Sequence, residues 1–297
     1  MPRFIASSDK HLTTLLPRCR QDEDWLGTQK RLLQFIANEA NKRKCPVHDY
    51  GDIFDTARVP SIIVSMFLEF AFSVNAGIRV LAGNHSLLYH NIDNMAESSF
   101  GIIDKIVKSG DKRIQYFDDI GQYAHFNEEL KGKETGLLFI HRLTFENSKT
   151  IPPNVNAVTA NDLLLEYPNA KWIFVGDNHH SWHYEKKGKH VISSGCMYRD
   201  ASDMKEYQPI VYYIDTEKDI VEEIKIPDTE KIIDDSYIIE RDMKENRISA
   251  FVEKLRNNES VNLDFLENIE NGLLVNKKLS KDTVKMIRYL CEEKEEK

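Results

Sequence analysis

The feature that most constrains this chain is a series of five short polar cassettes, most of which directly follow an apolar run. The five are Asp9-Lys10-His11, Gly51-Asp52, Gly83-Asn84-His85, His141 and Gly176-Asp177-Asn178-His179. Successive cassettes lie 32 to 57 residues apart, and a strand–helix–strand unit needs roughly 30 residues. Open α/β sheets place their functional side chains at the carboxyl ends of the strands. The spacing therefore predicts an α/β fold in which the five cassettes meet at one sheet edge.

Seven side chains in these cassettes are of types that bind metal ions. They are Asp9, His11, Asp52, Asn84, His141, Asp177 and His179. The set offers oxygen and imidazole nitrogen but no thiolate, which favours Mn²⁺, Fe²⁺ or Zn²⁺ over Cu⁺ or an iron–sulfur cluster. Seven ligands are too many for one tetrahedral ion, whereas two ions bridged by a carboxylate fit the number. Two ions about 3.5–4 Å apart are the arrangement that hydrolyses phosphate esters.

The segments between the cassettes predict alternating strands and helices. The expected strands are 4–8, 78–82, 136–140 and 171–175, and the expected helices are 28–41, 61–74, 99–108 and 160–167. Two apolar segments, 208–214 and 220–226, flank a polar tetrad and predict a β-hairpin. The polar sequence 45–50 allows only a short strand before Asp52, and it makes His48 and Asp49 candidates to support the metal ligands.

Composition narrows the functional classes. The chain has 297 residues, of which 41% are hydrophobic and 30% charged, and these values exclude a disordered chain and a membrane channel. Its net charge of −8 gives no support to a broad basic surface for nucleic acid. Polar residues interrupt the longest apolar stretch, 61–80, which therefore predicts a buried helix. We expect a cytoplasmic protein in which Cys45 and Cys196 are packing residues.

Taken in order, the motifs DxH, GD, GNH, a single His and GxxH resemble those of the calcineurin-like metallophosphoesterase superfamily. The sequence GDIFDTARVPS at 51–61, with VLAGNH at 80–85, is similar to the SbcD-type nuclease subunit. Homologues of that subunit act with an SbcC-type ATPase in double-strand-break processing. The resemblance covers residues 1 to about 226. It implies a DNA exonuclease or endonuclease that serves repair or recombination.

The resemblance also implies a fold and a division into domains. The fold would be a metallophosphoesterase-type four-layer β-sandwich flanked by helices, formed by a catalytic domain at 1–227. The remaining residues, 228–297, would form a small, mostly helical extension that caps the site or docks a partner. Two amphipathic segments, 248–255 and 283–290, are the expected docking helices.

Position by position, the resemblance implies roles for the cassette residues. One ion would be held by Asp9, His11, Asp52 and His179, and the other by Asp52, Asn84, His141 and Asp177. His85 would lie beside the scissile phosphate as the catalytic acid or a stabiliser of charge, without binding metal. The cofactors would be two divalent ions, with Mn²⁺ preferred and Mg²⁺ as the alternative. The implied partners are DNA, an SbcC-type ATPase and a second copy in a homodimer, with no membrane.

Two positions depart from the family pattern. The last motif usually reads Gly-His-x-His, whereas Asp177 replaces the first histidine here. Aspartate can still bind metal, and its charge favours Mn²⁺ or Mg²⁺ over Zn²⁺. In the loop VISSGCMYR, Cys196 follows Gly195, whereas members of the family commonly have serine at this position.

Several alternatives remain open at the level of the sequence. The same site could serve a phosphodiesterase or phosphatase for small molecules or phosphoproteins, which the acidic net charge favours. A non-catalytic scaffold is disfavoured because every cassette keeps its ligands. Four basic residues are candidate contacts for DNA phosphates, namely Lys186, Lys187, Lys189 and Arg199. The lysine-rich segment 186–189 fits a plain hairpin turn better than a DNA contact.

Overall fold

The computed structural model describes residues 3–118, 121–126, 136–155, 157–228, 233, 234 and 285. The chain divides into two units, Met1–Asp235 and Ser236–Lys297. The sheets and helices described below belong to the first unit. Apart from isolated positions, the predicted extension at 228–297 and its docking helices, 248–255 and 283–290, lie outside the described residues. The domain boundary after residue 227 therefore stays a prediction.

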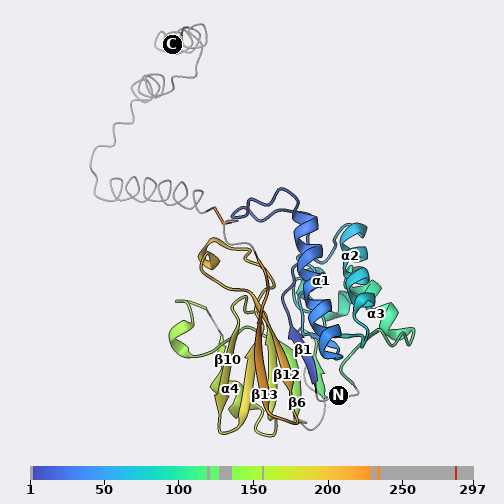
Figure 1. Cartoon of the computed structure of the whole chain (residues 1–297). Helices are drawn as coiled ribbons and strands as arrows, with labels where there is room; N and C mark the ends of the chain where they lie inside the picture. The colour runs from blue at the N-terminus through green and yellow to red at the C-terminus, as the bar shows by residue number, and fades with distance from the viewer. Residues whose placement is uncertain are drawn as a thin grey trace. The chain divides into compact units, whose positions relative to one another are not determined.

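Two large β-sheets form the centre of the first unit (Figure 1). In spatial order, one sheet consists of β13 (Ile220–Lys225), β12 (Ile210–Asp215), β1 (Arg3–Ser7), β2 (Val47–Asp49), β3 (Ile78–Val80) and β4 (Ile114–Gln115). The other consists of β10 (Trp182–Lys186), β11 (Lys189–Ser193), β9 (Trp172–Gly176), β6 (Leu137–His141) and β5 (Gln122–Ala124). A small pair, β7 (Thr144–Phe145) and β8 (Val158–Thr159), lies outside both.

Aromatic side chains fill the space between the two sheets. Phe4 on β1 meets Phe174 on β9 with ring centroids 5.2 Å apart, and Phe139 on β6 stacks on Phe174 at 4.9 Å. All three side chains are fully buried. Successive side chains of a strand point to opposite faces of the sheet. The outer face of each sheet also carries apolar side chains, which must be shielded from water.

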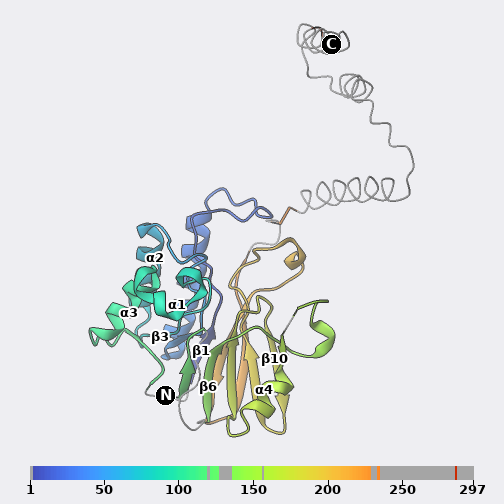
Figure 2. The same cartoon turned by 180° about the vertical axis from the view of Figure 1, so that it is seen from behind.

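Helices supply that cover on both sides of the sandwich (Figures 1 and 2). The helices α1 (Trp25–Arg43), α2 (Ser61–Ser73) and α3 (Phe100–Lys108) share one apolar core with the outer face of the first sheet. The helix α4 (Ala160–Glu166) packs on the outer face of the second sheet. The predicted four-layer arrangement of helices around a β-sandwich is therefore confirmed.

Sequence patterns located these elements to within a few residues, with some exceptions. The hairpin β12–β13 is antiparallel, as predicted, and β2 has only three residues. The hairpin β10–β11 was not among the predicted strands, because its first strand is largely polar. Its turn consists of Lys187 and Gly188, both with positive φ, as two-residue hairpins favour. Pro60 is the N-cap residue of α2. No helix among the described residues is long and apolar enough to cross a membrane.

Candidate metal centre

The five cassettes lie at the carboxyl ends of parallel strands. Strands β1, β2 and β3 run parallel in the first sheet, as do β6 and β9 in the second. Asp9, Asp52 and Asn84 follow the first three strands, His141 is the last residue of β6, and the final cassette begins at the last residue of β9. The first sheet therefore contributes three cassettes and the second contributes two, whereas the spacing predicted that all five meet at the edge of one sheet.

Unusual backbone conformations turn the cassette side chains toward one another. Asp9, His11, Asp52 and Asp177 have φ values of 47°, 42°, 49° and 78°, a region that residues other than glycine rarely occupy. Hydrogen bonds between the loops hold this conformation. The Asp9 N–H donates to the Gly51 carbonyl, and the His11 N–H donates to the Asp52 carbonyl, both at 2.9 Å. Strain of about 1–3 kcal/mol at each such position is typical of functional sites.

The first ligand group consists of Asp9, Asp52 and His141, whose ligand atoms all lie within 4.8 Å of one another. All three residues are buried. The His141 Nε2 atom lies 3.2 Å from Asp52 Oδ2 and 3.0 Å from Asn84 Oδ1. Asp177 adds a carboxylate 3.9 Å from the same nitrogen. The structure thus brings Asp52, the predicted bridging residue, together with the other predicted ligands of its second ion. These are Asn84, His141 and Asp177.

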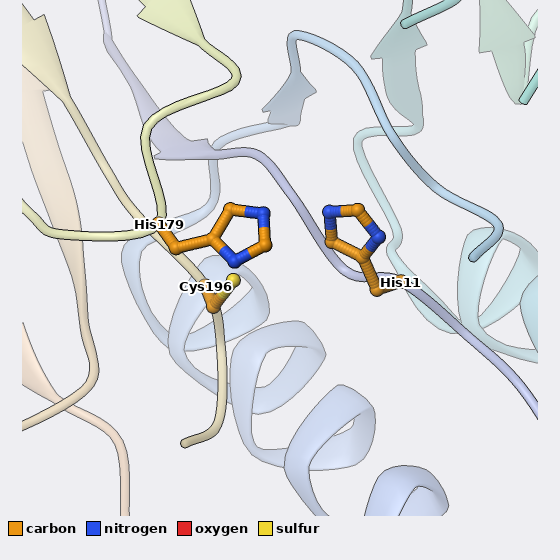
Figure 3. A group of neighbouring side chains, drawn as sticks. All are labelled: His11, His179 and Cys196. Atoms are coloured by element: carbon orange, nitrogen blue, oxygen red, sulfur yellow. The ribbon is translucent and has the colours of Figure 1, made fainter. Parts of the chain in front are cut away.

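A second ligand group lies beside the first and is formed by His11, His179 and Cys196, again within 4.8 Å (Figure 3). The two imidazole rings face each other with centroids 4.7 Å apart. A third group joins His11 to Asp55 and His85. Both predicted histidine ligands of the first ion are therefore in one place, together with a thiol that the sequence indicated only as packing.

Three of the histidines are oriented in the same way. The His141 Nδ1 atom lies 3.1 Å from the Tyr50 carbonyl, the His179 Nδ1 atom lies 3.2 Å from Asp200 Oδ2, and the His11 Nδ1 atom lies 3.5 Å from Asp55 Oδ1. An oxygen that accepts a hydrogen bond from Nδ1 leaves Nε2 free to bind a metal. Nε2 of His11 is buried and has no hydrogen-bond partner among the described residues.

The surroundings of His141 favour a positive charge at its Nε2 atom. With Nδ1 donating to Tyr50, this nitrogen faces two acceptors, Asp52 and Asn84. Burial disfavours the imidazolium, yet the Asp52 carboxylate outweighs burial and raises the pKa of His141 to about 10. At His179, burial is likewise outweighed, by the hydrogen bond and charge of Asp200, and the pKa rises to about 9.

The donor set therefore fits divalent cations. Within the described residues, the ion pairs of Asp52 and Asp177 are formed with histidines and with no lysine or arginine. The nearest lysine in sequence, Lys10, is fully buried and pairs with Asp49 instead. In the absence of metal, protons on the imidazoles balance the carboxylates. A bound cation can replace those protons.

His85 takes a position beside these groups. Its backbone N–H donates to Asp52 Oδ1 at 2.9 Å, and its Nδ1 atom lies 3.1 Å from the Asp55 carbonyl. Its ring meets the His11 ring edge to face, with centroids 4.9 Å apart. Since Nδ1 has an acceptor, Nε2 is the nitrogen that can act on a substrate.

Three residues of the site were not among the ligands predicted from the sequence, namely Asp55, Asp200 and Cys196. Asp55 belongs to the GDIFD motif, so the motif hinted at its place but not at its contact with His11. Asp200 meets His179 only because a loop folds back after β11. His48 and Asp49, predicted to support the ligands, behave differently. His48 stacks on Phe4 between the sheets at 3.9 Å, and Asp49 pairs with Lys10.

The basic residues proposed as DNA contacts divide into two groups. Lys186, Lys187 and Lys189 are on the β10–β11 hairpin. Arg199 is buried, and its Nε atom lies 3.2 Å from Asp228 Oδ2 while its Nη1 atom donates to the Lys205 carbonyl. A guanidinium held in this way does not reach a DNA backbone, which argues against the predicted contact at Arg199.

No family model matches the sequence, and no curated protein matches it. Several solved structures are similar in fold. An archaeal phosphodiesterase aligns with 16% identity over 75% of this chain and 99% of its own, with a TM-score of 0.39. A dimetal phosphatase from Danio rerio aligns with 10% identity over 75% and 98%, with a TM-score of 0.42. A predicted phosphoesterase from Streptococcus pneumoniae aligns with 11% identity over 75% and 97%, with a TM-score of 0.33. These likenesses concern the fold, so function depends on the chemistry of the site.

Proposed function

We propose that the protein is a metal-dependent phosphoesterase that holds two divalent ions at the carboxyl edge of its two sheets. One observation carries this proposal: three imidazoles anchored through Nδ1 converge with buried carboxylates, and no lysine or arginine of the described part of the chain pairs with Asp52 or Asp177 there. When bound, the ions would activate water and neutralise the charge that develops on the phosphate. Asp9, His11, Asp52 and His179 would hold one ion, and Asp52, Asn84, His141 and Asp177 the other.

His85 has the role of the proton donor in this proposal. The Asp55 carbonyl fixes its Nδ1 atom, and Asp52 fixes its backbone, so the ring presents Nε2 in a fixed direction. A positioned imidazole can protonate the leaving oxygen of a phosphate ester as its bond to phosphorus breaks. General acid catalysis of this kind contributes about 10²–10⁴-fold to the rate.

The preferred ion at the half of the site around Asp177 is Mn²⁺, with Mg²⁺ as the alternative. This half of the site has mainly oxygen donors, which hard cations favour. They come from Asn84 and from the carboxylates of Asp52 and Asp177. Burial raises the pKa of Asp177, and the neighbouring Asp9 and Asp52 charges raise it further. A cation at this half would offset that repulsion between the carboxylates.

We further propose DNA as the substrate, with an SbcC-type ATPase and a second copy of the chain as partners in the cytoplasm. The sequences GDIFDTARVPS and VLAGNH support this choice. The lysines of the β10–β11 hairpin give this choice no support. His190 on β11 pairs with Trp172 at the amino end of β9, so the hairpin turn lies at the opposite end of that strand from the metal centre. Lys186 and Lys189 also donate to Asn161 Oδ1 and to the Pro168 carbonyl. The second candidate is a phosphodiesterase for small molecules, which the net charge of −8 favours.

The test is hydrolysis of end-labelled single- and double-stranded DNA with Mn²⁺, compared between the wild type and His85→Asn. Chromogenic phosphodiesters are included in the same assay. DNA cleavage by the wild type, with about 10²–10⁴-fold less by the variant, is the expected result. Turnover of the small ester alone, even with the ATPase added, would replace DNA with the second candidate. Inactivity on every ester would refute the phosphoesterase.

A further inference from the structure

The residue that the proposed function leaves unused is Cys196, and its position is fixed by the backbone. The preceding Gly195 has a φ of 65°, and a Cβ there would collide with the His179 carbonyl, Ser181 and Tyr207. Glycine thus lets the two loops approach closely. The Cys196 N–H then donates to the His179 carbonyl at 3.0 Å. The thiol is held directly beside an imidazole of the metal centre.

Among the described residues, the Cys196 thiol makes only a weak hydrogen bond to another protein group. Its recorded hydrogen bond, to Asp200 Oδ2, is 3.8 Å long, near the limit even for sulfur. The same Asp200 oxygen lies 3.2 Å from His179 Nδ1. Cys196 is fully buried, yet it lies among polar groups and not in the apolar clusters of the described core. Packing alone therefore does not account for this position.

An independent observation points to a ligand at this place. His11 is 3% exposed, and its Nε2 atom has no hydrogen-bond partner among the described residues. Because its Nδ1 atom faces Asp55 at 3.5 Å, Nε2 is the nitrogen left to face His179. Figure 3 shows one nitrogen of each ring directed toward the other, with the sulfur beside the second nitrogen of His179. The ligand atoms of the three residues all lie within 4.8 Å of one another.

We propose that Cys196 is a thiolate ligand of the ion held by His11 and His179, so that the two metal positions differ in chemistry. The inference rests on the proposed function, since it concerns the same centre. On binding, the S–H bond breaks, a sulfur–metal bond forms and the proton leaves to solvent. Thiolate and imidazole suit Zn²⁺, Co²⁺ or Fe²⁺ better than Mn²⁺ or Mg²⁺. The other ion position, formed by Asp52, Asn84, His141 and Asp177, keeps its preference for Mn²⁺ or Mg²⁺.

The experiment uses Co²⁺ added to the metal-stripped full-length chain. The wild type is expected to bind two Co²⁺ and to show both visible ligand-field bands and a near-ultraviolet sulfur-to-cobalt charge-transfer band. Cys196→Ser is expected to keep the visible bands and lose the near-ultraviolet band, and to lose about 10–100-fold in Zn²⁺ affinity relative to Mn²⁺. The matched control is Cys45→Ser, which removes a buried thiol just before β2, at the opposite end of that strand from the site.

The outcomes separate this inference from the proposed function. Two results would overturn the assignment of Cys196 as a thiolate ligand. In one, the wild type binds Co²⁺ without a charge-transfer band; in the other, Cys196→Ser shows the same band as the wild type. Neither result would contradict the proposed phosphoesterase activity. Failure of the wild type to bind Co²⁺ or Mn²⁺ would refute the proposed function itself. If Cys196→Ser does not fold, alkylation of the wild type decides: Zn²⁺ should slow labelling of Cys196 more than labelling of Cys45, which is also buried and reports the general stabilisation of the fold. Equal slowing of both thiols, or no slowing of Cys196, would also overturn the inference.

Discussion

At the scale of single residues, the partner of each Nδ1 atom decides what a histidine of this centre can do. Tyr50 offers a carbonyl to His141, whereas Asp200 offers a carboxylate to His179. A carboxylate that accepts from a ligand histidine fixes its orientation and makes the free nitrogen more basic. Such partners change metal affinity although they do not touch the metal.

Replacing Asp200 by asparagine should therefore weaken metal binding at His179. We expect about a 10–100-fold loss of affinity for one of two ions, measured by titration of the metal-stripped protein. Asp219→Asn is the control, because Asp219 makes a similar 3.2 Å contact to His190 away from the centre. Equal affinities in Asp200→Asn and the wild type would contradict the role given to this carboxylate.

A different histidine, His48, should make the fold sensitive to acid. Burial, with a smaller effect of the Arg79 charge, lowers its pKa well below the ordinary value of 6.5. Below pH 6.5 the unfolded chain therefore binds a proton that the folded chain excludes, and the free energy of unfolding falls as the pH falls. The expected slope is about 1.4 kcal/mol per pH unit.

Urea unfolding of the metal-free protein between pH 5 and 7 measures this slope. His48→Phe, which keeps the ring between Phe4 and Phe117, should remove His48's part of it. An unchanged slope in His48→Phe would show that His48 takes up its proton without unfolding.

At the scale of elements, a buried ion pair joins the loop after β1 to the end of β2. Lys10 and Asp49 are fully buried, and the Lys10 ammonium also donates to Ser7 Oγ at 2.6 Å. Since Lys10 stands between Asp9 and His11, this pair also fixes the direction of two predicted ligands. The structure of the metal centre thus depends on a charge that does not enter it.

Breaking this pair should cost much more than breaking a surface pair. Lys10→Met leaves Asp49 buried without a partner, and we expect the free energy of unfolding to fall by about 3–5 kcal/mol. The double variant Lys10→Met with Asp49→Leu should recover most of that loss. The control, Lys30→Met, breaks an exposed pair with Glu69 and should cost less than about 1 kcal/mol. A similar loss in the single and double variants would disprove the pairing.

The sequence predicted elements well where local pattern determines structure. Apolar runs ending in polar cassettes identified β1, β3, β6 and β9, because buried strands require continuous apolar residues. The hairpin turn at 186–189 was predicted, but its strands β10 and β11 were not, because His183, Glu185 and Lys186 interrupt the apolar pattern. Cys196 and Asp200 reach the site through a loop that returns across the sheet edge, and no local pattern encodes such a return.

At the scale of the whole first unit, the metal centre lies where the two sheets meet. Asp9, Asp52 and Asn84 come from one sheet, and His141 and Asp177 from the other. Ions that bind both sets would join the two halves of the sandwich. They would also relieve repulsion among carboxylates that burial has brought together.

Removal of metal should therefore lower the thermal stability of the protein. A ligand at 100 times its dissociation constant stabilises the fold by about 2.7 kcal/mol, which corresponds to a Tm shift of about 5–10 °C for a unit of this size. Scanning calorimetry with Mn²⁺ and with a chelator measures the shift. Asp52→Asn should show a smaller Tm difference between Mn²⁺ and chelator than the wild type, and an unchanged Tm in the wild type would count against a bound ion.

The most direct test of the two-ion centre is the number of ions bound per chain in the wild type and in Asp52→Asn, after equilibrium dialysis against Mn²⁺ or Zn²⁺. Asp52 lies between the two ion positions, with His141 on one side and His11 on the other. The account predicts two ions in the wild type and at most one in the variant. A wild type that binds no ions, or a variant that keeps both, would contradict it.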